Sequence, residues 1–348
     1  MKTAIFLISF FLISISFNMK SFSQSMLFPV KIDGKYGYID STGKIVIPPK
    51  FNFASSFLNG YAVIKLQNPG ILSFLIPDKT GFIDLQGNVK MLPEFRELRP
   101  FCNGLALAKK TGFLFLPDSF DFIDTAMNII LDLEYADVGN FSDGLARIKT
   151  EEFRLFESSI EKYGFIDRLG KIVIPIQFES AGEFSEGRVN VTLNGKREFV
   201  DVNGKMVIEA KYNRVGYFSM GVAPVMIDSL WGYIDKEGNT KLPFIYQDAR
   251  AFSDGLALVK QAGKWGFIDL SGNLVIPCKY EEISSFSEGL SAVKICGKWG
   301  YIDKSGKLVI QPEYEIAFPF DHNRAAVKVD DRIGYIDREG NYIWNPEK

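Results

Sequence analysis

The sequence predicts an all-β protein made of about nine tandem repeats, each a three-stranded antiparallel meander. The first observation is a recurring tetrapeptide, Gly-aromatic-Ile-Asp, with degenerate copies that end at Asp124 and Asp201. The second is its spacing, which is 34 residues five times in succession from Asp167 onward. A fixed period of this size is typical of repeat architectures, in which each unit buries its apolar face against its neighbours. The full copies end at Asp40, Asp84, Asp167, Asp235, Asp269, Asp303 and Asp337.

Each repeat contains three short β-rich segments separated by glycine turns, which is the pattern of an antiparallel meander. Residues 257–282 give the clearest copy. The second turn is Asp-x-x-Gly in eight repeats, where Asp can accept backbone N–H groups and Gly can supply a positive φ. In the third repeat Met127 and Asn128 follow the aspartate, and we expect Asn128 to take the left-handed position.

A connector of constant length follows the third segment of each repeat. In it an aromatic residue, an apolar residue and a phenylalanine recur at intervals of three, which predicts a short helical or 3₁₀ turn lying on the sheet, with the aromatics between units. Each repeat Asp lies 17 residues before the connector phenylalanine in all eight cases, so the variation in length lies in the first hairpin. These phenylalanines are Phe57, Phe101, Phe141, Phe184, Phe218, Phe252, Phe286 and Phe320.

The segments Lys264–Asp269 and Lys298–Asp303, both Lys-Trp-Gly-aromatic-Ile-Asp, resemble the bacterial WG-repeat (KWG-repeat) proteins. The resemblance covers nearly the whole chain after its first residues and implies a repeat fold. It implies no general biochemical activity and no cofactor. A third copy has Trp231, and the other six repeats hold different residues at the tryptophan position: Tyr36, Thr80, Phe120, Tyr163, Arg197 and Ile333.

For the overall shape we expect an open β-solenoid or superhelical array, with a closed toroid or propeller as the alternative. Residues 27–32 resemble the first strand of a meander, and residues 341–344 complete a third strand at the other end. The repeats are therefore whole at both ends. Closed propellers usually have four-stranded blades and often complete one blade with strands from both termini, so whole three-stranded units favour the open array.

The N-terminal residues predict export. Residues 1–23 combine a positive start at Lys2, an apolar run of 14 residues from Ala4 to Phe17, and small residues at 21 and 23. This pattern is typical of a signal peptide cleaved before Gln24, which leaves residues 24–348 as the repeat array. The alternative is a retained anchor, but the run is shorter than the roughly 20 residues that span a bilayer. We expect no stable membrane span after cleavage and a periplasmic, cell-surface or secreted protein.

Composition excludes several classes of function. Without Lys2 and Lys20, 38 Lys and Arg stand against 42 Asp and Glu, a net charge of −4 with the two signs mixed along the chain. This argues against nucleic acid as a partner. Three cysteines do not make a disulfide framework; Cys102 replaces a serine of its sister repeats, and pairing of Cys278 with Cys296 stays open. His322 is the only histidine, so we expect no histidine-built zinc site, no other metal and no cofactor.

The nine repeat aspartates suggest a metal or glycosidase site, since both need clustered carboxylates. However, each of them occupies the same place in a hairpin turn, where it has a structural role in every copy. A catalytic pair should break the symmetry of the repeats. We therefore expect these carboxylates to cap turns.

Two features are candidates for a binding surface. Trp231, Trp265 and Trp299 lie at equivalent positions and would either form an exposed ladder or pack against neighbouring units. Insertions at residues 68–80, 111–121 and 150–162 lengthen three consecutive first hairpins, which would either cover one another or form a recognition surface. The apolar residues of these insertions are Phe74, Leu75, Ile76, Leu114, Phe115, Leu116, Phe153 and Phe156.

Together these observations predict an exported, non-enzymatic, monomeric repeat protein that offers a binding or scaffold surface to a protein or a glycan. One rival is a hydrolase that acts on cell-surface polymers; another is a purely structural envelope component. An enzyme would need a concave pocket with carboxylates that break the repeat symmetry and have shifted pKa values. A binding protein would need an extended exposed patch.

Overall fold

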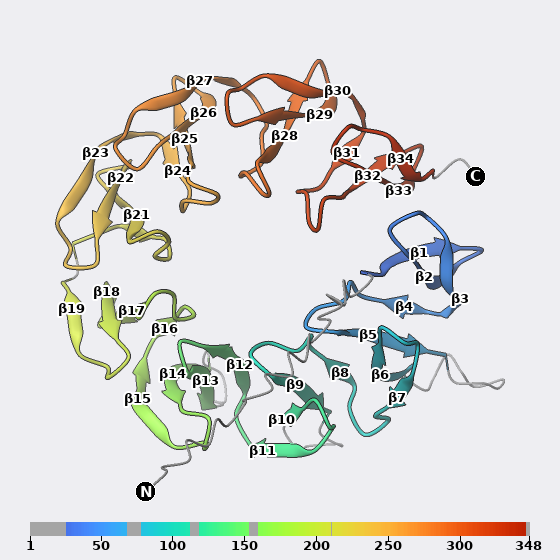
Figure 1. Cartoon of the computed structure of the whole chain (residues 1–348). Helices are drawn as coiled ribbons and strands as arrows, with labels where there is room; N and C mark the ends of the chain where they lie inside the picture. Colours follow the sequence, from blue (N-terminus) through green and yellow to red (C-terminus); the bar gives the residue numbers. More distant parts are fainter. Residues whose placement is uncertain (1–25, 68–77, 112–117, 153–158, 210, 346–348) are drawn as a thin grey trace, which may run out of the picture.

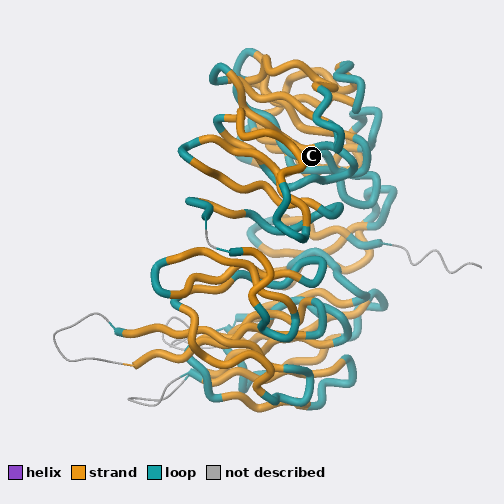
Figure 2. Tube along the Cα trace, turned by 90° about the vertical axis from the view of Figure 1, so that its left-hand side faces the viewer, coloured by secondary structure: helices purple, strands orange, loops and turns teal. Residues whose placement is uncertain are grey.

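The computed structural model describes residues 26–67, 78–111, 118–152, 159–209 and 211–345, and the regular structure in these ranges is entirely β. No helix there has the length and apolar character to cross a membrane. The predicted signal peptide lies outside the described residues. The strands form nine small antiparallel sheets, one per repeat, numbered here as units 1 to 9 in chain order. Figure 1 shows these sheets following one another around a ring, and Figure 2 shows the same ring from the side.

Seven of the nine sheets have four strands, and units 1 and 8 have three. Unit 1 contains β1 (Phe28–Ile32), β2 (Lys35–Ile39) and β3 (Ile45–Phe51); unit 2 contains β4 (Phe53–Ala54), β5 (Tyr61–Leu66), β6 (Lys79–Asp84) and β7 (Val89–Met91); unit 3 contains β8 (Glu97–Leu98), β9 (Leu105–Lys110), β10 (Ser119–Asp124) and β11 (Ile129–Leu133). Unit 4 contains β12 (Asp137–Ser142), β13 (Leu145–Glu152), β14 (Ile160–Ile166) and β15 (Ile172–Phe178); unit 5 contains β16 (Ser180–Ala181), β17 (Arg188–Leu193), β18 (Lys196–Asp201) and β19 (Met206–Ile208); unit 6 contains β20 (Arg214–Val215), β21 (Val222–Ile227), β22 (Leu230–Asp235) and β23 (Thr240–Tyr246). Unit 7 contains β24 (Asp248–Ala249), β25 (Ala257–Gln261), β26 (Lys264–Ile268) and β27 (Leu274–Tyr280); unit 8 contains β28 (Leu290–Ile295), β29 (Lys298–Asp303) and β30 (Leu308–Tyr314); unit 9 contains β31 (Ile316–Ala317), β32 (Ala325–Val329), β33 (Arg332–Ile336) and β34 (Tyr342–Trp344).

The meander is present in every unit, but the prediction of a helical connector is wrong. In unit 7 the connector is the two-residue strand β24, whose Ala249 pairs with Val259 of β25. The N–H of Arg250 also donates to the carbonyl of Leu258 at 2.9 Å. An extended connector satisfies backbone groups at the edge of the first strand that a helical turn would leave unpaired. The connector therefore turns the expected three-stranded unit into a four-stranded one.

The glycine of Gly-aromatic-Ile-Asp is required because the third strand crosses close to it. A Cβ built on Gly266 would lie 2.5 Å from the carbonyl oxygen of Ile276, and the ladder is irregular there, between Trp265 and Phe267. Two repeats replace this glycine with an acid, Asp121 in unit 3 and Glu198 in unit 5. In unit 3 the strands pair directly at this point, with Asp121 opposite Asp132.

The Asp-x-x-Gly turns form as expected in eight units, with Gly272 in unit 7 at a φ of 83°. The expectation for unit 3 is wrong, because Met127 takes the left-handed conformation with a φ of 68°. Asn128 instead donates its side-chain amide to Oδ2 of Asp124 at 3.0 Å. The turn keeps its shape without glycine because this aspartate still organises it.

Aromatic pairs fill the space between units, as the repeat pattern predicted. In units 6 and 7, Tyr233 packs on Phe252 with ring centroids 5.2 Å apart, and both side chains are buried. The same pairing of a second-strand aromatic with the next connector phenylalanine recurs at all eight junctions between consecutive units. Aromatic pairs add favourable edge-to-face contacts to the burial of their area. The core of the protein thus lies between units.

The ring closes between units 9 and 1, which overturns the open solenoid that the sequence favoured (Figure 1). Arg324 of unit 9 donates to the carbonyl of Ser41 at 3.1 Å, and its guanidinium lies 4.5 Å from the ring centroid of Phe28. Arg188 makes the equivalent bond within the ring, to the carbonyl of Lys236 in the next unit, at 3.4 Å. The seam therefore repeats an internal contact between units. Closure occurs by packing whole units face to face, with no blade shared between the termini, so the intact ends of the sequence did not reveal it.

Candidate functional site

The predicted surface on the long first hairpins stays a prediction. Leu66 pairs with Lys79 at the base of the first of these hairpins, and Glu152 pairs with Ile160 at the base of the third. The apolar residues proposed for this surface lie outside the described residues: Phe74, Leu75, Ile76, Leu114, Phe115, Leu116, Phe153 and Phe156.

The three tryptophans occupy equivalent, half-buried positions at the edges of the clusters between units. Trp231, Trp265 and Trp299 each pack against the buried residues at the junction with the next unit. Trp265 is also flanked by cations, with Arg250 at 5.7 Å and Lys260 at 5.6 Å from its ring. The structure thus gives the tryptophans a packing role, while part of each ring stays accessible.

The repeat aspartates are occupied by their turns. Oδ1 of Asp269 accepts the backbone N–H groups of Ser271 and Asn273, both at 2.9 Å. All nine aspartates accept the same two bonds, from the residues two and four positions later. The side-chain amide of Asn273, with the backbone bonds, holds the pKa of Asp269 below its ordinary 3.8. In the described ranges, no three His, Cys, Asp or Glu residues are grouped so as to hold a metal ion.

Two described carboxylates, Asp121 and Glu198, break the repeat symmetry, and Asp121 is the more deeply buried. Asp121 is fully buried at a position that is glycine in most repeats, and Lys110 lies 2.6 Å from its Oδ2. Burial raises its pKa, the neighbouring Lys110 opposes this, and Asp132 adds to the rise. Because no part of Asp121 reaches solvent, a substrate could approach it only if the unit opened.

His322 and the cysteines lie in simple environments. His322 is exposed in a turn, and its Nδ1 lies 2.8 Å from Oδ1 of Asp321. Cys278 and Cys296 are both free thiols in the structure. Sγ of Cys102 points at the carbonyl of Phe141 at 4.0 Å, in place of the serine hydroxyls of its sister repeats.

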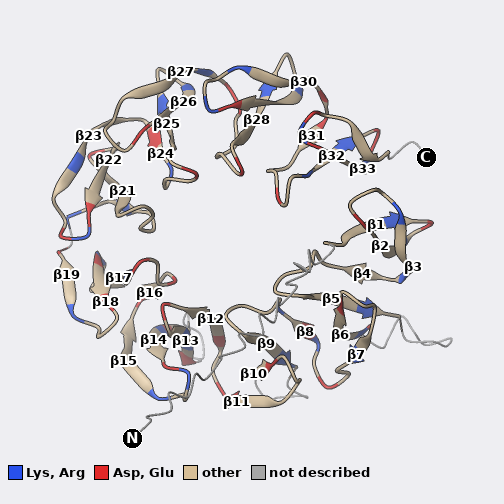
Figure 3. Ribbon diagram, in the orientation of Figure 1, with Lys and Arg blue, Asp and Glu red and all other residues tan. Residues whose placement is uncertain are grey.

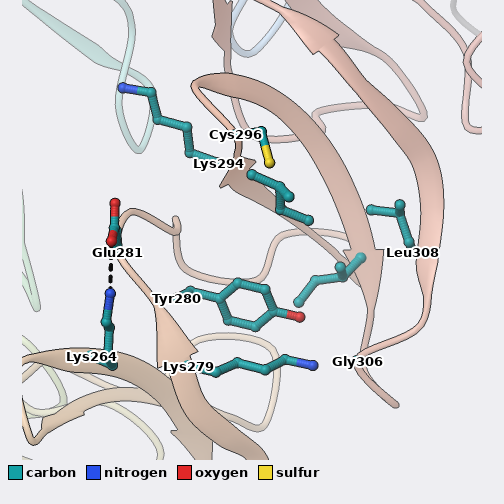
Figure 4. Close-up of a pocket in the computed structure, with 10 residues that line it drawn as sticks. Lys264, Lys279, Tyr280, Glu281, Lys294, Cys296, Gly306 and Leu308 are labelled. Carbon is teal, nitrogen blue, oxygen red and sulfur yellow. Dashed lines mark hydrogen bonds and ion pairs between the residues drawn. The ribbon is translucent and has the colours of Figure 1, made fainter.

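The most distinctive described cavity is a cleft of about 630 Å³ between units 7 and 8 (Figure 4). Unit 7 supplies polar residues from β26, the end of β27 and the residue after it: Lys264, Lys279, Tyr280 and Glu281. Unit 8 supplies an apolar wall and the second hairpin turn: Ile295, Ile302, Gly306 and Leu308, with Lys294 and Cys296 at the first hairpin.

The charges of this cleft are not balanced. Lys264 is paired with Glu281 at 2.7 Å, and Lys294 with Glu282 at 2.7 Å. Lys279 is exposed and lies over the ring of Tyr280 at 5.1 Å, with no carboxylate partner among the described residues. The cleft can therefore offer one uncompensated ammonium beside an apolar wall.

This cleft was not predicted from the sequence, although the sequence holds a signal for it. Three lysines occur at fixed repeat phases around it. Lys264 lies five residues before Asp269 and Lys279 ten residues after it. Lys294 lies five residues after Gly289, the glycine of the turn that precedes the first long strand of unit 8, here called the inner turn. The same three phases hold lysine at one other junction, between units 1 and 2: Lys35, Lys50 and Lys65. There, Asn52 and Phe53 replace the two glutamates, and Asn52 accepts a hydrogen bond from Lys35 at 2.5 Å.

Comparison with known proteins supports the repeat and the fold. The family model described as "WG containing repeat" matches this chain eight times, at residues 36–68, 81–112, 122–152, 163–196, 199–231, 231–265, 265–299 and 299–332. No curated protein sequence matches. Among solved structures, a crystal structure of the eukaryotic initiation factor is similar at a TM-score of 0.62 and 13% identity, covering 91% of this chain and 95% of that one.

A second similar structure is the β-propeller domain of the trilobed protease from Pyrococcus furiosus, whose title describes an open velcro topology. It aligns at a TM-score of 0.41 and 8% identity, covering 93% of this chain and 99% of that one. This likeness is too weak to carry an argument. The first likeness concerns the fold alone, because identity is so low.

Proposed function

We propose that this chain, which belongs to the family of proteins built from WG-containing repeats, is an exported, non-enzymatic binding or scaffold protein for a protein or a glycan. The observation that carries the proposal is the uniform use of the repeat carboxylates in their own turns. The cleft between units 7 and 8, by contrast, lies at a junction between units. Figure 3 shows acidic and basic residues interspersed around the ring, which suits a platform for local contacts more than a surface for one polyanion.

The proposed interaction surface is the set of three long first hairpins, and its test is their removal. Residues 68–77, 112–117 and 153–159 would each be replaced by an Asn-Gly turn, which closes a two-residue hairpin in the observed register. Affinity capture from the native envelope, using residues 24–348 as bait, should recover a partner that the shortened variant loses. A folded variant that keeps every partner would contradict the proposal for this surface.

Export has its own test. Mass spectrometry of the protein purified from its native cells should give a mature N-terminus at Gln24. A chain that retains residues 1–23 would contradict cleavage and would favour the retained anchor.

The rival hydrolase is tested at Asp121, the described carboxylate with a raised pKa that breaks the repeat symmetry. We expect the mature protein to release no reducing ends from envelope polysaccharides. Release that disappears in Asp121→Asn while the variant stays folded would replace the binding proposal with an enzymatic one.

A further inference from the structure

We propose that the cleft between units 7 and 8 binds a small amphiphilic anion, with Lys279 holding the carboxylate or phosphate and the aliphatic wall of unit 8 holding the apolar part. This deepens the proposed function, and rests on it, by naming a ligand class for one site on the ring. Most junctions between units lack this set of three lysines, so the site is not a general feature of the repeat.

The size and the lining of the cleft fit a small molecule. Ligand pockets in proteins are commonly about 300–1,000 Å³, mostly apolar, with a few polar groups that fix orientation. The cleft has a volume of about 630 Å³. The half-buried Ile295 and Leu308 form its apolar wall and pack against the buried Ile302.

The charge pattern selects an anion. Glu281 forms an ion pair with Lys264, and Glu282 forms one with Lys294. An anionic ligand that displaced either carboxylate would exchange one ion pair for another and gain little binding free energy. Lys279 has only the face of Tyr280 as a partner among the described residues. In Figure 4 its side chain runs beside the Tyr280 ring toward Gly306, along the cleft. A carboxylate or phosphate there would form a charge-assisted hydrogen bond without breaking an existing ion pair.

A matched control exists elsewhere on the ring. Lys50 has the same repeat phase as Lys279 and lies over Phe51 at 5.2 Å, as Lys279 does over Tyr280. Its neighbours differ, because Asn52 and Phe53 stand where the cleft has Glu281 and Glu282. Substitution at Lys50 therefore removes an equivalent charge without touching the cleft.

The experiment is calorimetric titration of the mature protein with octanoate and octyl phosphate, both below their micellar concentrations, and with octanol below its solubility limit. We expect at least one of the two anions to bind about tenfold more tightly than octanol, the lower range for a hydrogen bond to a charged group. The anion that binds better identifies the headgroup as carboxylate or phosphate. Lys279→Gln should weaken that anion about tenfold, while Lys279→Arg and Lys50→Gln should keep most of the affinity.

Cys296 reports whether binding occurs in the cleft. It is exposed and lines the cleft, whereas Cys102 and Cys278 are half-buried. The bound anion should slow alkylation of Cys296 by N-ethylmaleimide in the wild type, and Lys279→Gln should need about tenfold more anion for the same protection. Binding of neither anion, equal binding of octanol, or unchanged affinity in Lys279→Gln would overturn the inference. None of these results would alter the capture experiment on the long hairpins, so the two proposals fail independently.

Discussion

The phenol of Tyr335 donates a hydrogen bond to the carbonyl oxygen of Pro29, 306 residues earlier in the chain, at 2.9 Å. Tyr335 lies two residues before the last repeat aspartate. At the same phase, Tyr38, Tyr233 and Tyr301 donate to carbonyls 17 residues later, in the next unit, at 3.0, 2.8 and 2.8 Å. The junction of units 9 and 1 therefore uses the same donor as the junctions between consecutive units, but its acceptor lies in the first strand, β1, instead of directly after a connector strand.

Removing the Tyr335 hydroxyl should destabilise the junction of units 9 and 1 about as much as removing the Tyr233 hydroxyl destabilises the junction of units 6 and 7. Burial raises the pKa of Tyr335 to about 12, so the phenol stays a neutral donor at physiological pH. Tyr335→Phe should lower the free energy of unfolding in urea by about 0.5–1.5 kcal/mol, because a part-buried hydrogen bond is lost. Tyr233→Phe is the matched control. A full loss in Tyr233→Phe with none in Tyr335→Phe would show that the seam does not form.

The repeat glycine should be intolerant of even one added carbon. In Gly266→Ala the new Cβ would lie 2.5 Å from the carbonyl oxygen of Ile276, so β27 would have to move. We expect a loss of about 1–3 kcal/mol in urea unfolding, as for overpacked cores. Gly139→Ala is the control, since its Cβ would meet nothing nearer than 3.4 Å. Equal stability of the two variants would refute the close approach.

A second set of hydrogen bonds joins the inner turns of neighbouring units. The hydroxyl of Ser185 donates to the carbonyl of Phe218 at 2.6 Å, whereas Cys102 at the same phase lies 4.0 Å from the carbonyl of Phe141. Ser185→Ala should therefore cost about 1 kcal/mol, and Cys102→Ser should gain a few tenths to 1 kcal/mol. Differential scanning calorimetry would show the two midpoints moving in opposite directions. A fall in both would mean that the serine bond does not stabilise the junction.

Acid should destabilise the ring through its turns. The pKa of Asp269 is held below 3.8 in the folded protein, so its turn adds stability above the unfolded-state value. That stability is lost as the pH falls through the lower folded-state value. We therefore expect the urea midpoint to fall steeply below about pH 4, and less steeply in Asp269→Asn, which has one titrating turn fewer. An unchanged midpoint between pH 7 and pH 3 would contradict this role of the aspartates.

The sequence predicted what each unit does locally. Asp269 and Gly272 lie three positions apart in one turn, so their role could be predicted from their spacing alone, and the phase of Phe252 predicted its place between units. The sequence could not predict the ring, because closure depends on a small rotation per unit that no single repeat encodes. The cleft was missed for a related reason: Lys264, Lys279 and Lys294 are far apart along the chain and meet only at a junction between units.

The most direct test of the closed ring is a pair of distances measured by double electron–electron resonance. Thr42, Ser305 and Glu339 are exposed and occupy the same place in the Asp turns of units 1, 8 and 9. Nitroxides on cysteines at 42 and 339, in a background without the native cysteines, should give the same distance as nitroxides at 305 and 339. An open array would separate the first pair by the length of the whole molecule, and that result would contradict the closed ring.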